Sequence, residues 1–273
     1  MIVVLSLVGF LVLSIPSVQT HLANRLTKQI NQNFETQIKV EGVSVGYDGS
    51  VNLNSFFVAD HHSDTLFYAK KFKTDLYSLR QWVNGNLFFS TTQLEDVIFK
   101  IIEYEREENN SLLEFYNRLL AHTESENDTP VFIKIDDLNV TEGHFMIIDK
   151  KKHQKPLQYE GIDLQAKDFY FLNDGVEVKL QKLKFNSKEY GNLNLFETDL
   201  FYSPCSLDIN YFRLSSGKSE IAGMMNIFLP EGDFFDFDDK AQVNIEVNSF
   251  LAREQLKCFI DLPKNFQPIA IKL

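Results

Sequence analysis

The sequence predicts a mostly β protein, in which an N-terminal membrane helix and an amphipathic helix precede a long curled antiparallel sheet with one lateral helix. Three observations predict this class. An uncharged apolar run opens the chain, hydrophobic residues at helical spacing follow it directly, and alternation of period two then continues almost to the last residue. Consecutive predicted strands are joined by short turns without crossover helices, which is typical of antiparallel pairing.

The opening apolar run covers residues 2–15 and stops at Pro16. As a helix of fourteen residues it would be about 21 Å long, shorter than the roughly 30 Å hydrocarbon core of a bilayer. It also lacks the basic residues that precede a signal segment, since Arg25 is the first positively charged residue. We interpret residues 1–17 as a transmembrane signal anchor and expect its upstream residues to lie outside this chain; a cleaved signal peptide and a helix packed on a soluble core are the alternatives. The anchor residues are Ile2, Val3, Val4, Leu5, Leu7, Val8, Phe10, Leu11, Val12, Leu13 and Ile15.

Residues 18–34 are predicted to form the amphipathic helix. Val18, Leu22, Leu26, Ile30 and Phe34 recur every four residues, with polar residues between them. A helix of this kind can lie in a membrane interface, so we expect it to form a collar beside the anchor.

The β-groove region is predicted to start at residue 35, and we expect it to continue beyond residue 273. Its alternation changes phase at Gly42, which indicates a β-bulge or bend. The strands expected before the lateral helix are residues 38–45, 51–59, 66–79, 87–92 and 94–103. The lateral helix covers residues 111–120, where Ser111 and Glu114 match a capping box, and a flexible linker covers residues 121–129.

Strands with one apolar and one polar face fill the rest of the chain. A sheet of about a dozen strands must curl or close, because its twist accumulates. Little besides the lateral helix could cover the apolar face, so we expect lipid acyl chains to cover it; an ordinary sandwich core is the alternative. The candidate groove residues are Val176, Val178, Leu180, Leu207, Ile209, Tyr211, Val243, Ile245 and Val247.

Composition argues against several classes of function. The net charge is −11, and the chain lacks the basic stripe that a nucleic-acid partner would require. No nucleophile elbow, phosphate-binding loop or dinucleotide fingerprint occurs, so we expect neither an enzyme nor a cofactor. The two cysteines, Cys205 and Cys258, could pair in an oxidising compartment or remain free thiols.

Two groups of side chains have the chemistry of metal ligands. His61 and His62 are adjacent, and neighbouring residues of a strand point to opposite faces, so we interpret them as part of a polar turn. The four aspartates among residues 233–239 lack the spacing of a calcium loop and are interpreted as an acidic loop. We therefore expect no metal site.

Several segments resemble the AsmA/TamB family of envelope proteins of diderm bacteria. They are residues 15–24 (IPSVQTHLAN), 38–45 (IKVEGVSV) with Leu53, 64–71 (DTLFYAKK), 221–226 (IAGMMN) and 237–240 (FDDK). Each motif is weakly specific, but together they are spread over nearly the whole chain.

The resemblance implies the N-terminal portion of a TamB-like translocation/assembly module protein. Such a protein is a single-pass inner-membrane protein whose curled sheet forms a β-taco groove in the periplasm of a Gram-negative bacterium. It is associated with phospholipid transfer to the outer membrane and with outer-membrane biogenesis, together with an outer-membrane barrel partner of the TamA/BamA type. That partner would meet a C-terminal region that this chain lacks. Two further functions stay open: assembly of outer-membrane or autotransporter proteins by β-augmentation, and structural tethering of the envelope.

Overall fold

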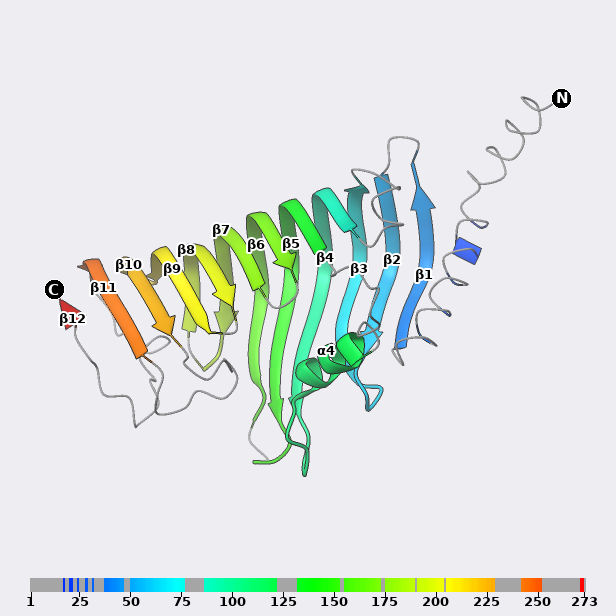
Figure 1. The fold of residues 1–273 in the computed structure, drawn as a ribbon, viewed down its shortest axis with the longest axis horizontal. Helices are drawn as coiled ribbons and strands as arrows, with labels where there is room; N and C mark the ends of the chain where they lie inside the picture. The colour runs from blue at the N-terminus through cyan, green and yellow to red at the C-terminus, as the bar shows by residue number, and fades with distance from the viewer. Residues whose placement is uncertain are drawn as a thin grey trace. The chain divides into compact units, whose positions relative to one another are not determined.

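Strands dominate the computed structural model, and they form one open sheet in chain order from β1 to β12 (Figure 1). The mostly β class predicted from the sequence is therefore confirmed. The structure describes residues 17, 20, 21, 24, 28, 31, 37–46, 50–76, 86–121, 132–152, 155–172, 175–189, 191–203, 205–228, 242–251 and 271–272. None of the helices in these ranges is both long enough and apolar enough to cross a bilayer. The predicted anchor residues 2–15 lie outside the described part.

The strands differ in length, and those in the middle of the order are the longest. Their bounds are β1 Gln37–Val45, β2 Ser50–Ala59, β3 Thr65–Leu76, β4 Asn86–Glu103, β5 Phe132–Asp149, β6 Leu157–Leu172, β7 Gly175–Ser187, β8 Gly191–Ser203, β9 Ser206–Ser216, β10 Ser219–Phe228, β11 Gln242–Leu251 and β12 Ile271–Lys272. Strands β1 to β3 and β6 to β11 pair antiparallel, whereas β12 pairs parallel to β11. The two strands expected at 87–92 and 94–103 are a single strand, β4, in which Asp96 has a positive φ of 52°.

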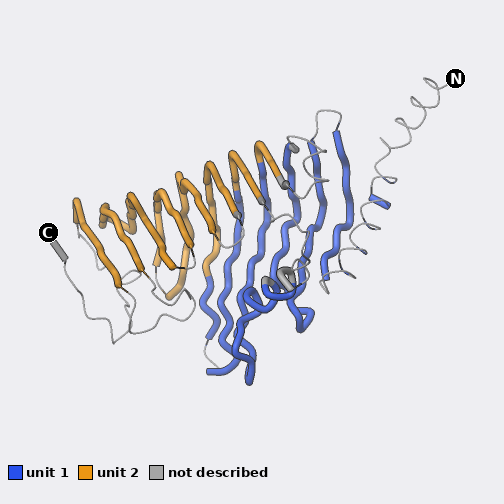
Figure 2. Tube along the Cα trace, viewed as in Figure 1, with its two compact units in different colours: residues 1–79, 92–129, 140–158 blue, residues 80–91, 130–139, 159–273 orange. Residues whose placement is uncertain are grey.

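The chain divides into two compact units (Figure 2). Unit 1 comprises residues 1–79, 92–129 and 140–158, and unit 2 comprises residues 80–91, 130–139 and 159–273. The buried apolar side chains described in unit 1 come from β2, β3, β4 and the residue that follows β4. They are Val58, Ala59, Leu66, Ala69, Leu94, Val97, Ile102 and Tyr104.

The phase change predicted at Gly42 coincides with an irregularity in the neighbouring strand. The ladder passes from the pair Val40–Phe56 to the pair Gly42–Asn54. Ser55, between these positions on β2, has a positive φ of 52°. The ladder keeps its register through this point, so the predicted β-bulge is absent from the pairing of β1 with β2, and the positive φ of Ser55 marks a local distortion of β2.

Polar side chains of the N-terminal segment bond to the backbone of β1. Thr20 and Asn31 are among its helical residues that are described. The Thr20 hydroxyl accepts a hydrogen bond from the Val43 amide at 3.0 Å and donates to the Val43 carbonyl at 3.3 Å. The Asn31 side chain bonds both the amide and the carbonyl of Ile38, each at 2.7 Å. Side chains thus occupy hydrogen-bonding groups that the first strand of a sheet would otherwise offer to another strand.

Replacing Asn31 by leucine is expected to open this edge locally. The substitution leaves two backbone groups of Ile38 without their partner, at a cost of about 1–2 kcal/mol in local stability. Hydrogen exchange of the Ile38 amide should accelerate about tenfold, while the exposed control Asn24→Leu should leave it unchanged. Equal exchange rates in the two variants would contradict the role given to Asn31.

Helix α4 (Ser111–Ala121) is the predicted lateral helix, but its N-cap differs from the prediction. Asn110, and not Ser111, is the cap: its side-chain oxygen accepts hydrogen bonds from the amides of Leu112 and Leu113, both at 3.0 Å. The Ser111 hydroxyl is fully buried and instead accepts a hydrogen bond from the Ile102 amide at 2.9 Å. The predicted N-cap was therefore wrong by one residue, because the Ser111 side chain bonds the backbone of β4 and not the first turn of the helix. Ala121, the first residue of the predicted linker, is the last residue of α4, and residues 122–129 lie outside the described part.

Candidate functional site

The strand register of unit 2 gathers apolar side chains on one face of β7 to β11. Residues directly opposite each other in an antiparallel pair share a face, so successive pairings join them into rows across the strands. The rows are Val176, Tyr202, Leu207, Ile227, Val243; then Val178, Leu200, Ile209, Met225, Ile245; then Leu180, Thr198, Phe212, Gly223, Val247; and last Leu183, Phe196, Leu214, Ile221, Phe250. We call these positions the apolar face.

Eight of the nine candidate groove residues belong to the first three of these rows. The exception is Tyr211, which lies opposite Asp199 and is 42% exposed. A bulge in β9 is the reason: Leu200 pairs with Ile209, but Thr198 pairs with Phe212. The placement of Tyr211 with Leu207 and Ile209 was therefore wrong, because one extra residue in the strand moves the next side chains to the other face.

Sequence reasoning missed the contribution of β8 and the whole fourth row. Residues 196, 198, 200 and 202 of β8 alternate regularly, a signal that was present in the sequence. The fourth row was hidden by bulges, since Leu180 is followed on this face by Leu183, and Val247 by Phe250. A count of alternating residues that ignores bulges assigns the residues after each bulge to the wrong face.

Strands β7, β9 and β11 each carry one extra residue within the four rows, and β8 carries one relative to β7 beyond them, between Phe196 and Leu193. Each bulge bends its strand and increases the local twist. At the bulge of β11, the backbone approaches Gly223 of β10 so closely that a Cβ on this residue would lie 2.1 Å from the Glu246 carbonyl oxygen. Only glycine fits this position.

Most of the apolar face is half-buried. Among the fifteen positions of the first three rows, eleven have intermediate exposure. The other four are buried: Thr198, Ile209, Gly223 and Ile227. A closed core of aliphatic residues would bury nearly all such positions. The side chains of this face are therefore packed against each other and yet retain accessible surface.

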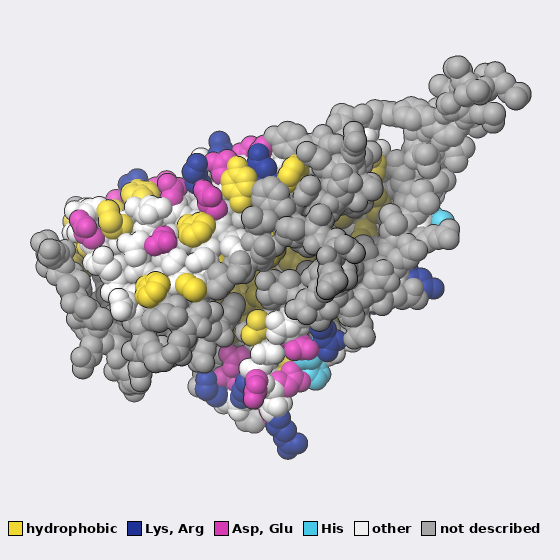
Figure 3. All heavy atoms as spheres, in the orientation of Figure 1, with side chains coloured by type: hydrophobic (Ala, Val, Ile, Leu, Met, Phe, Trp, Pro, Cys, Tyr) yellow, Lys and Arg dark blue, Asp and Glu magenta, His cyan; other side chains and the backbone are white. Residues whose placement is uncertain are grey.

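The other face of these strands carries ion pairs, and the exposed apolar side chains Phe201, Tyr211, Met224 and Phe228 also lie on it. Lys179 bonds Asp168 at 2.8 Å, Arg213 bonds Glu220 at 2.9 Å, and the Asn226 amide donates to Asp208 at 2.8 Å. In the view of Figure 3, the surface over β8 to β10 shows hydrophobic, acidic and uncharged side chains singly, without one large apolar area. The two faces of the sheet thus differ in chemistry.

Asp163 lies between two lysines of β7 and makes the stability of unit 2 depend on pH. Its carboxylate accepts hydrogen bonds from Lys182 at 2.7 Å and is 3.2 Å from the Lys184 ammonium group. The Lys182 hydrogen bond lowers the pKa of Asp163 below its ordinary value, against the opposing effect of burial, and Lys184 lowers it further.

Lowering the pH from 5 to 2 should therefore destabilise the parent protein more than the Asp163→Asn variant. A depressed pKa contributes stability above the unfolded value of about 3.9, and this contribution is lost as the pH falls through the folded value. The difference in unfolding free energy should be up to about 1 kcal/mol, because the pair is partly solvated. The exposed control Asp199→Asn should follow the parent in urea titrations at each pH. Identical pH profiles for the parent and Asp163→Asn would contradict this role.

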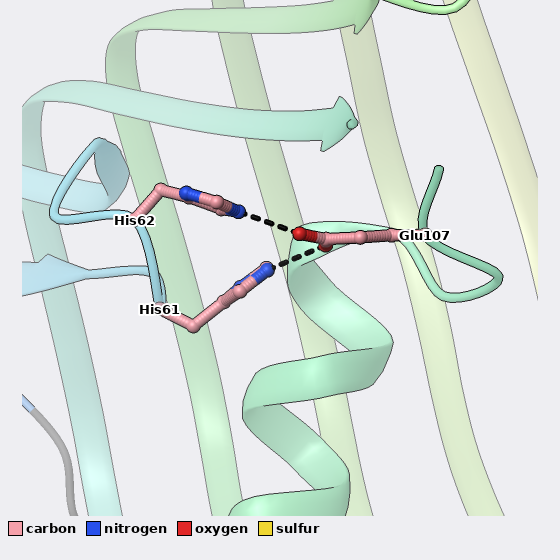
Figure 4. A group of neighbouring side chains, drawn as sticks. All are labelled: His61, His62 and Glu107. Carbon is pink, nitrogen blue, oxygen red and sulfur yellow. Dashed lines mark hydrogen bonds and ion pairs between the residues drawn. The ribbon is translucent and has the colours of Figure 1, made fainter. Parts of the chain in front are cut away.

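A second cluster of functional side chains lies in unit 1, where His61 and His62 converge on Glu107 (Figure 4). His61 Nε2 lies 2.7 Å from one carboxylate oxygen of Glu107, and His62 Nε2 lies 2.7 Å from the other. Both residues lie in the turn between β2 and β3, as the interpretation of a polar turn predicts, so the alternation of side chains along a strand does not apply and the two imidazoles converge. Hydrogen bonds from His62 and His61 lower the pKa of the Glu107 carboxyl below its ordinary value.

Asp60 holds the turn that presents both histidines. It is 2% exposed, and one of its carboxylate oxygens accepts hydrogen bonds from the amides of His62 and Asp64 at 2.9 and 2.8 Å. The Tyr104 hydroxyl lies 2.6 Å from the other oxygen of Asp60 and 2.9 Å from Asp64, and its ring packs on His62 with centroids 3.9 Å apart. Burial, with these two carboxylates, raises the pKa of Tyr104 above its ordinary value.

Lys150 closes this cluster from the turn that follows β5. Its ammonium group lies 3.1 Å from the Asp64 carboxylate and 4.3 Å from the centre of the Tyr104 ring. Burial raises the pKa of Asp64, but the hydrogen bonds from Lys150 and Tyr104 outweigh it and leave this pKa below its ordinary value. Of the other side chains considered as metal ligands or disulfide partners, residues 233–239 and Cys258 lie outside the described residues. Cys205 is described and is an exposed free thiol.

Comparison of the sequence with protein-family models and with curated proteins finds no match. The apolar face of unit 2 and the histidine cluster of unit 1 are therefore interpreted from their own geometry.

Proposed function

We propose that this chain acts as an inner-membrane-anchored periplasmic protein that carries phospholipid between the inner and outer membranes and supports outer-membrane biogenesis. The observation that carries the proposal is the apolar face: four rows of mainly aliphatic and aromatic side chains that cross five strands, most of them half-buried. An acyl chain would cover this face, and the polar head group would stay in water.

The energetics suit transport as well as binding. Burying one methylene group contributes about 0.8 kcal/mol, so a lipid can be held by chain contacts alone. Neighbouring strands are about 4.8 Å apart, and each adds an aliphatic or aromatic side chain to the first two rows. A lipid that moves from one strand to the next thus exchanges equivalent contacts and meets no deep energy minimum.

The membrane anchorage and the periplasmic location in this proposal rest on the sequence. Residues 1–17 would supply the inner-membrane anchor, and residues 18–34 the interfacial collar. The resemblance to the AsmA/TamB family supplies the periplasmic location and an outer-membrane barrel partner of the TamA/BamA type.

Native mass spectrometry of the full chain, released gently from detergent, tests the proposal. We expect phospholipid adducts that survive removal of the detergent and that exchange with added phospholipid of a different mass. A chain that is free of lipid and acquires none from phospholipid vesicles would overturn the proposal.

Assembly of other proteins by β-augmentation is the second candidate function, and one observation favours it. The free side of β11 accepts a parallel strand, β12, at Ile245 and Glu246. At the opposite end of the order, Thr20 and Asn31 already bond β1 at Val43 and Ile38. This function would therefore use the β11 edge, and capture of unfolded barrel strands by lipid-free protein would support it. A purely structural tether would need the anchor but neither the apolar face nor this edge.

A further inference from the structure

The cluster formed by His61, His62 and Glu107 has the composition and convergence of a metal site, separate from the apolar face of unit 2. We propose that these three side chains bind one divalent transition-metal ion, with Zn²⁺ as the best match. The inference goes beyond lipid carriage and does not depend on it.

The donor set favours zinc over the hard cations. Two imidazole nitrogens and one carboxylate oxygen are ligands that Zn²⁺ binds in proteins, whereas Ca²⁺ and Mg²⁺ take oxygen ligands. Copper and nickel also bind imidazole, and the order of intrinsic affinities lets them compete at such a site. Three protein ligands leave a fourth tetrahedral position open for water.

The geometry is within reach of coordination. The three donor atoms lie within 4.8 Å of one another. Ligands about 2.05 Å from a tetrahedral zinc ion lie about 3.3 Å apart. The 2.7 Å contact of the coordinating carboxylate oxygen would therefore open by about 0.6 Å, and the longer separations among the three donor atoms would shorten to admit the ion. The exposed fractions of the His62 and Glu107 side chains are 45% and 33%, which gives both the room for this movement and an entry path for the ion.

The surrounding groups hold both imidazoles in place before any ion arrives. Asp60 fixes the turn through the amides of His62 and Asp64, and the ring of Tyr104 packs against both imidazoles, with centroids 5.3 Å from His61 and 3.9 Å from His62. Fixed orientation of the ligands reduces the entropic cost of coordination. His61, with its side chain only 10% exposed, is the most constrained of the three.

A bound ion would join two segments that are far apart in the sequence. Glu107 lies between β4 and α4, and the histidines lie between β2 and β3. The ion would therefore clamp the segment leading into the lateral helix against the β2–β3 turn. Its expected effects are one ion per chain and a higher unfolding temperature.

Zinc titration of the full chain, purified without a histidine tag and treated with chelator, tests the site. We expect one Zn²⁺ per chain in the parent, with affinity reduced at least about 100-fold in His62→Ala and Glu107→Gln. His144→Ala, which removes an exposed histidine of β5, and Cys205→Ser, which removes an exposed thiol, are the matched controls and should bind like the parent.

X-ray absorption of the zinc-loaded parent adds a readout that does not depend on the folding of any variant. It should show two imidazole nitrogens and further oxygen ligands at about 2.0–2.1 Å. Absence of stoichiometric binding, equal affinity in the ligand variants and controls, or a spectrum without imidazole would each overturn the proposal.

Discussion

Replacing Val178 and Ile245 together by aspartate should abolish the co-purification of phospholipid. Both residues belong to the second row of the apolar face, and four strand spacings, about 19 Å, separate them. An acyl chain that crosses this row would have to desolvate a carboxylate, which costs several kcal/mol. The lipid-to-protein ratio, measured by mass spectrometry, should fall by at least about tenfold, because each 1.4 kcal/mol lowers affinity tenfold.

The matched control adds the same charge to the same strands away from the apolar face. Gln181 and Asn244 are exposed residues of β7 and β11, so the variant Gln181→Asp with Asn244→Asp should retain lipid at the parental ratio. Circular dichroism should show the same β content in both variants. Retention of lipid by a folded Val178→Asp, Ile245→Asp protein would contradict the assignment of this face.

Gly223→Ala should cause a large loss of stability. Among the glycines described in unit 2 that do not have a positive φ, we expect alanine to be most costly at this position. The added Cβ would lie 2.1 Å from the Glu246 carbonyl oxygen and 3.1 Å from the Val247 Cα, both of them backbone atoms. Backbone cannot rotate aside as a side chain can, so β10 and β11 must separate at the bulge. We expect a loss of about 3 kcal/mol in the free energy of unfolding, measured by urea titration.

Gly42→Ala is the matched control, because the same atom is added to a strand glycine in unit 1. There, the nearest atom is the side-chain nitrogen of Asn54 at 3.2 Å, the end of a flexible side chain that can move. The expected change in the free energy of unfolding is below about 1 kcal/mol. Equal effects of the two substitutions would contradict the close approach of β11 to Gly223.

The strand pattern of unit 2 was predictable because alternation reports directly on which face a side chain occupies. Val176, Val178 and Leu180 lie on one face as their spacing predicts. The prediction failed at Tyr211, since a bulge is set by the local backbone path and has no fixed sequence signature outside glycine.

The histidine cluster was not predictable from spacing. Glu107 is 45 residues from His62, and its approach depends on the packing of the β4–α4 segment against the β2–β3 turn. The N-cap of α4 shows the same limit, because Ser111 has the right chemistry to cap the helix but bonds the Ile102 amide instead. Local patterns predict which groups are available, and tertiary packing decides which of them meet.

Photo-crosslinking in cells tests the central claim, the contact between acyl chains and the apolar face, most directly. A photoreactive phenylalanine derivative would be placed at Ile245 or at its neighbour Asn244, which lie on opposite faces of β11. The account predicts crosslinks to phospholipid from position 245 and none above background from position 244. Crosslinks of equal yield from both positions, or crosslinks to protein alone from position 245, would contradict it.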